Sequence, residues 1–148
     1  MKKAFCTIIC GFVVTYISLG SVVLSDPDGN GYLNISSFSE LCEFAENESY
    51  WDKNIELTQD IDASETKTMN DGKGWKPVGS IEKHFKGKFA GNGFCIDNLY
   101  INRPKESFIA FFGHTDSSAV IENLILNKFK FTGWRSIGSI AGSLNNSI

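Results

Sequence analysis

The segment Ile96–Asn102 reads IDNLYIN, and the later segment Ile121–Asn127 reads IENLILN. Both copies fit the pattern I-[DE]-N-L-x-[IL]-N. Each copy is followed by an apolar block that ends in glycine, first Ile109–Gly113 and then Ile137–Gly142. A period of about 20 to 50 residues predicts a unit that stacks on its own copies, because a single unit cannot bury its apolar face alone.

This repeat predicts an all-β chain folded as a right-handed parallel β-helix, or β-solenoid. Strands are expected at Ile55–Asp62, Ser107–Phe112 and Ile137–Ala141, with a longer strand or a strand pair at Ile121–Phe131, between turns rich in glycine. With one copy of the pattern in each coil and strands about 4.8 Å apart, the copies are expected to stack as Ile96 on Ile121, Asn98 on Asn123 and Leu99 on Leu124. Tight corners are expected at the glycines Gly87, Gly91, Gly93, Gly113, Gly138 and Gly142.

A short amphipathic helix is expected at residues 37–47. Ser37–Glu40 has the form of a capping box, and apolar residues follow at helical spacing. Such a helix would close the N-terminal end of the stack, since solenoids need a cap. We therefore expect residues 37–148 to form one β-solenoid domain with a helical cap, truncated or open at its C-terminal end.

The N-terminus predicts export from the cell. Residues 1–20 carry two lysines and an apolar run before Gly20, which is typical of a cleaved secretory signal. The alternative is an uncleaved anchor, because the apolar run is nearly long enough to span a bilayer. Residues 21–36 then form a polar lead-in, and the protein is expected to be secreted or displayed on the cell surface.

Charge excludes one class of partner. The chain of 148 residues has a formal net charge of −3, and cleavage after Gly20 would leave 12 basic and 17 acidic residues. A mildly acidic chain lacks the basic footprint of a nucleic-acid-binding protein.

The sequence resembles a known family. Phe85-x-Gly87-x-Phe89-x-Gly91-x-Gly93-x-x-Ile96-x-Asn98-Leu99, followed by Asn102-Arg103-Pro104, is similar to the bacterial GLUG-motif proteins. These include adhesin-like and IgA-peptidase-associated repeat proteins of the cell surface. The resemblance implies a β-solenoid in an extracellular setting and supplies no catalytic residues. The Gly-Leu-x-Gly block of the family is altered here, at Ala110–Gly113 and Gly138–Gly142.

Cysteines and acidic residues supply the remaining site candidates. Cys42 and Cys95 would be left after cleavage, either as a disulfide or as two buried thiols. Asp26, Asp28 and Asn30 imitate the start of an EF-hand loop, but the twelfth position is Ser37, where calcium normally finds a bidentate glutamate. A turn-rich lead-in is therefore the alternative to a calcium site, and no other cofactor is expected.

A carbohydrate-active β-helix is the alternative to a non-catalytic protein. Asp60 and Asp62 would share one strand face, with Asp71 on the following loop and Arg103 as a further candidate. The alternative for the three carboxylates is a solvated face with a turn residue, since carboxylates are normally exposed. The two histidines, His84 and His114, lie in no nucleophile motif.

Four aromatic residues, Tyr50, Trp51, Trp75 and Trp134, are candidates either for sugar stacking or for anchoring loops to the core. We expect a structural or adhesive protein without catalysis, whose partner is an extracellular protein or glycan. An inactive fragment of a larger surface protein is a further alternative. The C-terminal end of the stack would present strand edges, which favour self-association or continuation into a longer protein.

Overall fold

The computed structural model describes residues 22–144, so the expected signal peptide, residues 1–20, lies outside the described residues. The described part is mostly short β-strands and contains one α-helix, α1 (Phe38–Glu46). This confirms an all-β chain with a short helix near its N-terminus.

The strands are β1 (Leu33–Ile35), β2 (Ile55–Leu57), β3 (Ile61–Asp62), β4 (Lys88–Ala90), β5 (Cys95–Asp97), β6 (Tyr100–Asn102), β7 (Ser107–Ile109), β8 (Phe112–Thr115), β9 (Val120–Glu122), β10 (Ile125–Asn127), β11 (Lys130–Thr132), β12 (Arg135–Ile137) and β13 (Ala141–Leu144). Three 3-10 helices, η1 (Glu48–Tyr50), η2 (Ser64–Thr68) and η3 (Asn70–Gly72), lie between the early strands. β1 lies inside the segment that was expected to be only a polar lead-in.

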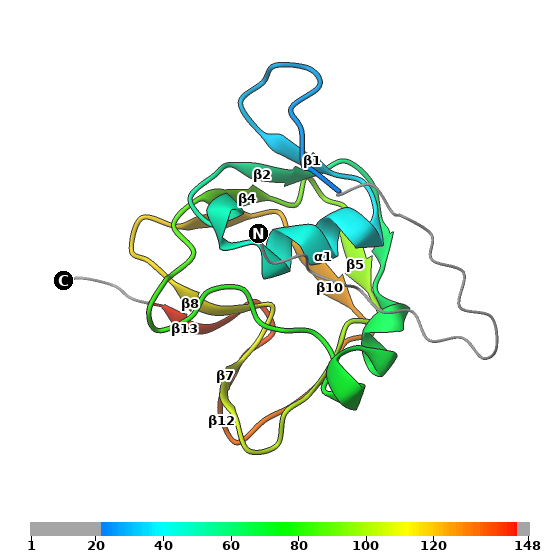
Figure 1. Ribbon diagram of the computed structural model, residues 1–148, viewed down its shortest axis with the longest axis vertical. Coiled ribbons are helices and arrows are strands. Elements are labelled where there is room, and N and C mark those ends of the chain that lie inside the picture. The colour runs from blue at the N-terminus through cyan, green and yellow to red at the C-terminus, as the bar shows by residue number, and fades with distance from the viewer. Residues whose placement is uncertain (1–21, 145–148) are drawn as a thin grey trace.

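Strands β4–β8 and β9–β13 form two successive courses, which we call the first and the second course. Each strand of the second course pairs in parallel with the strand of the same rank in the first: β9 with β4, β10 with β5, β11 with β6, β12 with β7 and β13 with β8. β2 and β3 pair with β4 and β5 from the other side, and β1 pairs with β2. Figure 1 shows β7 beside β12 and β8 beside β13, although these strands are far apart in the sequence.

The strands are shorter than the sequence pattern indicated. In the second course, β9, β10, β11 and β12 start at five-residue intervals. β9, β10 and β11 are each followed by a two-residue corner, whereas three residues separate β12 from β13. The expected strands at Ile55–Asp62 and Ser107–Phe112 are each divided by a corner, and Ile121–Phe131 spans parts of three strands, β9, β10 and β11. The expected strand at Ile137–Ala141 is wrong, because residues 138–140 form the connection between β12 and β13. A corner residue such as Asn98 or Asn123 adopts a positive φ, 61° and 51° respectively.

The expected stacking of Ile96 on Ile121 is wrong. Ile96 pairs with Ile61 on one side and Leu126 on the other, whereas Ile121 pairs with Phe89. The offset between the courses is longer than the spacing of the two sequence copies, so Asn98 and Leu99 do not stack on Asn123 and Leu124. The first copy of the I-x-N-L signature lies at the corner after β5, and the second copy lies at the corner after β9. The sequence repeat therefore marks corners and not successive courses.

The central residues of β4, β5 and β6 point into the core. These residues, Phe89, Ile96 and Ile101, are fully buried, whereas the neighbours on both sides of Ile96 are half-buried. Their partners in the second course lie on top of them and are only half-buried, namely Ile121, Leu126 and Phe131. Burial therefore falls from the first course to the second, because nothing in residues 22–144 covers the second.

The helix α1 forms as its sequence indicated and packs on this core. Ser37 accepts a hydrogen bond from the Glu40 N–H at 3.2 Å, and the Glu40 carboxylate accepts from the Ser36 N–H at 2.7 Å. The apolar face of α1 buries Leu41, Cys42, Phe44 and Ala45. The Phe44 ring lies 5.9, 5.5 and 6.5 Å from the rings of Phe85, Phe89 and Phe112, so α1 closes the core beside the first course.

The motif glycines serve mainly close approach between backbones. A Cβ on Gly87 would meet the Lys53 carbonyl, and one on Gly91 would meet the Asn123 carbonyl of the next course. Gly93 differs, because it has open space around it and a φ of +80°. Among the six glycines predicted at corners, only Gly93 has a left-handed backbone. The expected corners at Gly113 and Gly142 are wrong, because these residues lie inside β8 and β13.

We expect Phe44→Ala to lower the free energy of unfolding by about 3–5 kcal/mol, since the substitution leaves a cavity among three aromatic rings. Phe129→Ala is the matched control, because Phe129 is 42% exposed and its truncation leaves no enclosed cavity. Urea unfolding of both variants tests this. Equal losses in the two variants would contradict the role of α1 as the cover of the core.

Candidate functional site

The outer face of β3, β5 and β10 carries a line of acidic and amide side chains. Asp62, Asp97 and Asn127 occupy one register position on the three strands. The Asn127 side-chain amide donates to Asp97 at 2.6 Å, and the Asn98 amide donates to Asp62 at 3.0 Å. The line is therefore held together by its own hydrogen bonds.

Asp60 and Asp62 lie on one outer face, as expected, because both are exposed and Ile61 between them is buried. Asp60 accepts a hydrogen bond from the Cys95 N–H at 2.8 Å, and Asp62 also accepts from the Ser64 N–H at 3.0 Å. The Asn98 amide and the Ser64 N–H lower the pKa of Asp62, which is ionised at neutral pH. Asp71 contributes to no metal-binding cluster, since residues 22–144 contain no group of three His, Cys, Asp or Glu that could hold a metal ion.

Arg103 also serves the fold. Its Nε donates to the Trp75 carbonyl at 3.2 Å, and its guanidinium forms an ion pair with Glu106 at 3.0 Å. The Arg103 side chain is only 11% exposed. Arg103, like Asp60 and Asp62, is thus already engaged in contacts that fix strands and turns.

The loop of Asp26, Asp28 and Asn30 is closed by internal hydrogen bonds. Asp26 accepts from the Asn30 and Gly31 N–H groups at 3.1 and 2.9 Å, and the Gly31 bond in particular lowers the pKa of Asp26. The Asn30 amide donates to Asp28 at 3.1 Å and to Glu56 of β2 at 2.9 Å. These contacts suit a polar turn fastened to β2, which is the alternative that the sequence left open.

No disulfide joins Cys42 and Cys95, which corrects one of the two expectations for this pair. Cys42 is buried on α1, inside the core. Cys95 precedes the buried Ile96 on β5 and therefore faces outward. Burial and the neighbouring Asp97 raise the pKa of the Cys95 thiol.

The aromatic candidates divide into two groups. Trp51 and Trp75 are 1% exposed, and their indole N–H groups donate to the carbonyls of Phe44 and Phe111 at 3.1 and 3.2 Å. They anchor loops, and Tyr50 is half-buried and accepts from the Leu24 N–H. Trp134 is 65% exposed, at the corner between β11 and β12, and the Arg135 guanidinium lies 5.0 Å from its ring.

The structure also brings together two residues that the sequence did not link. The rings of His84 and His114 stack at 5.7 Å with an interplanar angle of 8°, and the Phe108 ring lies 4.3 Å from His114. Burial, and secondarily the nearby His84, lower the pKa of His114. The pairing depends on the contact between Phe85 and Thr115, which are far apart in the sequence and form an isolated bridge.

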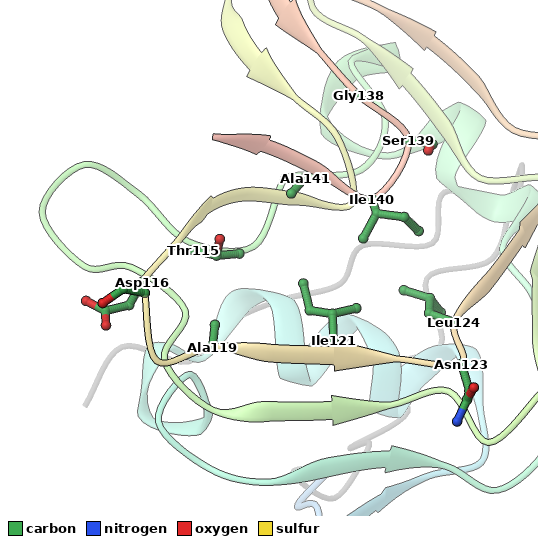
Figure 2. Close-up of a pocket in the computed structure, with 11 residues that line it drawn as sticks. Thr115, Asp116, Ala119, Ile121, Asn123, Leu124, Gly138, Ser139, Ile140 and Ala141 are labelled. Atoms are coloured by element: carbon green, nitrogen blue, oxygen red, sulfur yellow. The ribbon is translucent and has the colours of Figure 1, made fainter. Parts of the chain in front are cut away.

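The inner face of the second course is hollowed. A depression of about 630 Å³ is lined by residues of β8, β9 and β13 and their connections. Figure 2 shows Ile140 pointing into it from one side and Ile121 and Leu124 from the other, whereas Asp116 and Asn123 point away. This depression, which both apolar and polar residues line, could not be found from the sequence, because it depends on the register of the courses.

The hydrogen bonds of Asp62 predict a pH dependence of stability. The pKa of Asp62 lies below its ordinary value of 3.8, so its bonds stabilise the fold above about pH 3.8 and this stability is lost as pH falls through the lower folded pKa. We expect Asp62→Ala to be less stable than wild type at neutral pH, with the difference closing in acid. Asn98→Gly, which keeps the left-handed backbone, should show a smaller difference of the same kind.

Chemical denaturation at a series of pH values measures both variants. A stability difference for Asp62→Ala that stays constant down to strongly acidic pH would contradict this assignment.

Two curated proteins are similar to this chain. A protein named halomucin, from Haloquadratum walsbyi, is 31% identical over 156 aligned residues, which cover 99% of this chain and 2% of the relative. A putative Gly-rich membrane protein from Evansella cellulosilytica is 35% identical over 72 residues, or 49% of this chain and 8% of the relative. No family model matches the chain, and no solved structure matches it. The chain spans only a small fraction of the length of the relatives that it matches.

Within residues 22–144, no helix has the length and apolar character needed to cross a membrane.

Proposed function

We propose that this chain is a non-catalytic domain of the cell surface or the secreted fraction, built as a right-handed parallel β-solenoid. The observation that carries the proposal is the strand-by-strand parallel pairing of the second course on the first, through five consecutive strands. Solenoids of this kind expose long lateral surfaces, which commonly serve binding.

Three further points support the proposal. The names of the two relatives, halomucin and putative Gly-rich membrane protein, favour a surface location. The motif from Phe85 to Leu99 resembles the GLUG-motif proteins, and we propose membership of that group. The apolar start of the chain is typical of an export signal.

The ligand-binding position that we propose centres on Trp134. Large exposed aromatic rings are favoured at binding surfaces, where they bury much area at small entropic cost. Arg135 lies over the same ring and adds donors for the hydroxyl or carboxylate groups of a ligand. A glycan that stacks on the indole and accepts from the guanidinium fits this pair best.

We propose no enzymatic activity and no cofactor. A carbohydrate-active site would need Asp60, Asp62 and Arg103 to contact substrate. Each of these side chains instead holds a backbone group of the fold. Their hydrogen bonds therefore favour a structural role for all three.

We expect Trp134→Ala to reduce binding to glycans or to glycan-bearing cells at least tenfold, with unchanged thermal stability. Ile81→Ala is the matched control, because Ile81 is 70% exposed on a loop that carries no proposed contact. Glycan-array and cell-binding measurements on the three proteins test the proposal.

An equal loss of binding in the Ile81 variant would contradict a specific site at Trp134. The release of unsaturated uronides from polygalacturonate, lost in Asp60→Asn and Asp62→Asn, would overturn the non-catalytic proposal.

A further inference from the structure

We propose that the stacked imidazoles of His84 and His114 form an acid-sensitive latch, which holds the loop of residues 79–84 against β8 at neutral pH and releases it when both rings are protonated. The loop and the strand each contribute one ring to this contact. The latch involves neither Trp134 nor Arg135, so it does not depend on the glycan-binding position.

The loop is a bulge between two points that are fixed to β8. Val78 forms a parallel bridge with β8 just before the loop, and Phe85 forms another just after it. Six residues, 79–84, therefore stand opposite two residues of β8, Gly113 and His114. The excess residues cannot pair with the strand, and the three at the tip are exposed.

The ring stack fastens this bulge to β8. The centroids of the two rings lie 5.7 Å apart, with an interplanar angle of 8°. Ser80 and Lys83 bond to each other instead of to the strand. The Ser80 N–H donates to the Lys83 carbonyl at 2.8 Å, and the Lys83 N–H donates to the Ser80 hydroxyl at 3.1 Å. Without the stack, the tip of the loop is attached through its two ends.

The surroundings of His114 disfavour its charged form. Its ring is half-buried, and the Phe108 ring lies 4.3 Å away. Burial lowers the pKa of His114, and the nearby His84 lowers it further. Two imidazolium rings in this stack would repel each other, because their separation is smaller than the screening length of about 8 Å in physiological salt. The stack is therefore stable with neutral rings and is opposed by double protonation.

Charged groups face the pair from the loop itself, from the segment after β8 and from the segments before β2 and β4. They are Asp52, Glu82, Lys83, Lys86 and Asp116. Toward β7 and β13 the neighbours of His114 are uncharged, namely Phe108 and Ser143. Glu82 raises the pKa of His114, but burial and His84 outweigh it, so this pKa stays below its ordinary value.

Acid favours the open loop. The pKa of His114 in the closed loop lies below its ordinary value of 6.5, so the released ring binds a proton more readily than the stacked one. The stability of the closed loop is fully present above pH 6.5 and is lost as pH falls through the lower pKa of the closed state. Asp62 acts in a separate and more acidic range, because the pKa of its carboxyl group lies below 3.8.

Proton NMR of the purified chain between about pH 7.5 and about pH 5 tests the latch. The chain is expressed with residues 1–20 so that any processing takes place in the host. We expect the cross-relaxation between the His84 and His114 rings to be lost as pH falls. The backbone amides of residues 81–83 should then become mobile on the ps–ns timescale. Amides of β4 and β5 should stay unchanged, which verifies that the fold is intact.

Two variants separate the charge of the pair from its ring contact. His84→Phe keeps a ring that can stack but cannot take up a proton, so we expect its loop to stay ordered down to about pH 5. Glu82→Gln removes the carboxylate that raises the pKa of His114, so its loop should be released more completely in acid. Ile81→Ala is the matched control, because it changes an exposed residue of the same loop and leaves every charge in place. It should respond to pH as the wild type does.

A ring contact and an ordered loop that persist in the wild type down to about pH 5 would overturn the proposal. A His114 pKa at or above 6.5 would overturn it as well, and so would a wild-type pH response in His84→Phe. Simultaneous loss of order in β4 and β5 would also overturn it, because acid would then unfold the whole domain and not release one loop.

Discussion

The fold depends on the pairing of each short strand with the equivalent strand of the next course. A strand as short as β5 buries one central side chain and cannot satisfy its own backbone groups. Ile96 on β5 therefore becomes fully buried only because Ile61 lies on one side of it and Leu126 on the other. Strand pairing alone does not cover the aromatic residues of the first course. The helix α1 is therefore needed, because its Phe44 packs on them.

The corners impose one backbone conformation on residues of different chemistry. Asn98 follows β5 with a φ of 61°, and Lys128 follows the paired β10 with a φ of 51°. Within the strands, Phe108 of β7 and Ser136 of β12 form a second such pair, with φ values of 61° and 53°. For residues other than glycine and asparagine this conformation costs about 1–2 kcal/mol each. The stacking of one course on another therefore imposes the left-handed conformation on Lys128 and Phe108, although these residue types disfavour it.

Features determined by near neighbours could be predicted from the sequence. The capping box at Ser37–Glu40 and the apolar spacing after it correctly indicated α1, because both depend on contacts within one or two helical turns. The register could not be predicted in the same way. The connection between β4 and β5 is two positions longer than that between β9 and β10, so the offset between courses is larger at β4–β9 than at β5–β10. A single fixed period in the sequence therefore corresponds to the recurring I-x-N-L corner signature. It does not correspond to the offset between the courses, which varies from strand to strand.

The candidate sites show the same division. That Asp60 and Asp62 share a face followed from strand alternation alone, but the engagement of these two side chains by Cys95 and Asn98 depends on strands far apart in the sequence. The stacking of His84 on His114 and the depression on the second course are likewise long-range. Exposure separated Trp134 from the two buried tryptophans, although all three have the same intrinsic preference for partial burial.

The longer connection between β4 and β5 shows where this architecture can change in length during evolution. Its added positions, including the left-handed Asn92 and Gly93, bulge at a corner while the strands on both sides stay paired. An insertion inside a strand such as β5 would instead turn its one inward side chain toward solvent and bring a polar one into the core. Lineages of such chains should thus differ in corner length far more than in strand length, and ligand specificity can diverge at the corners without any change in the core.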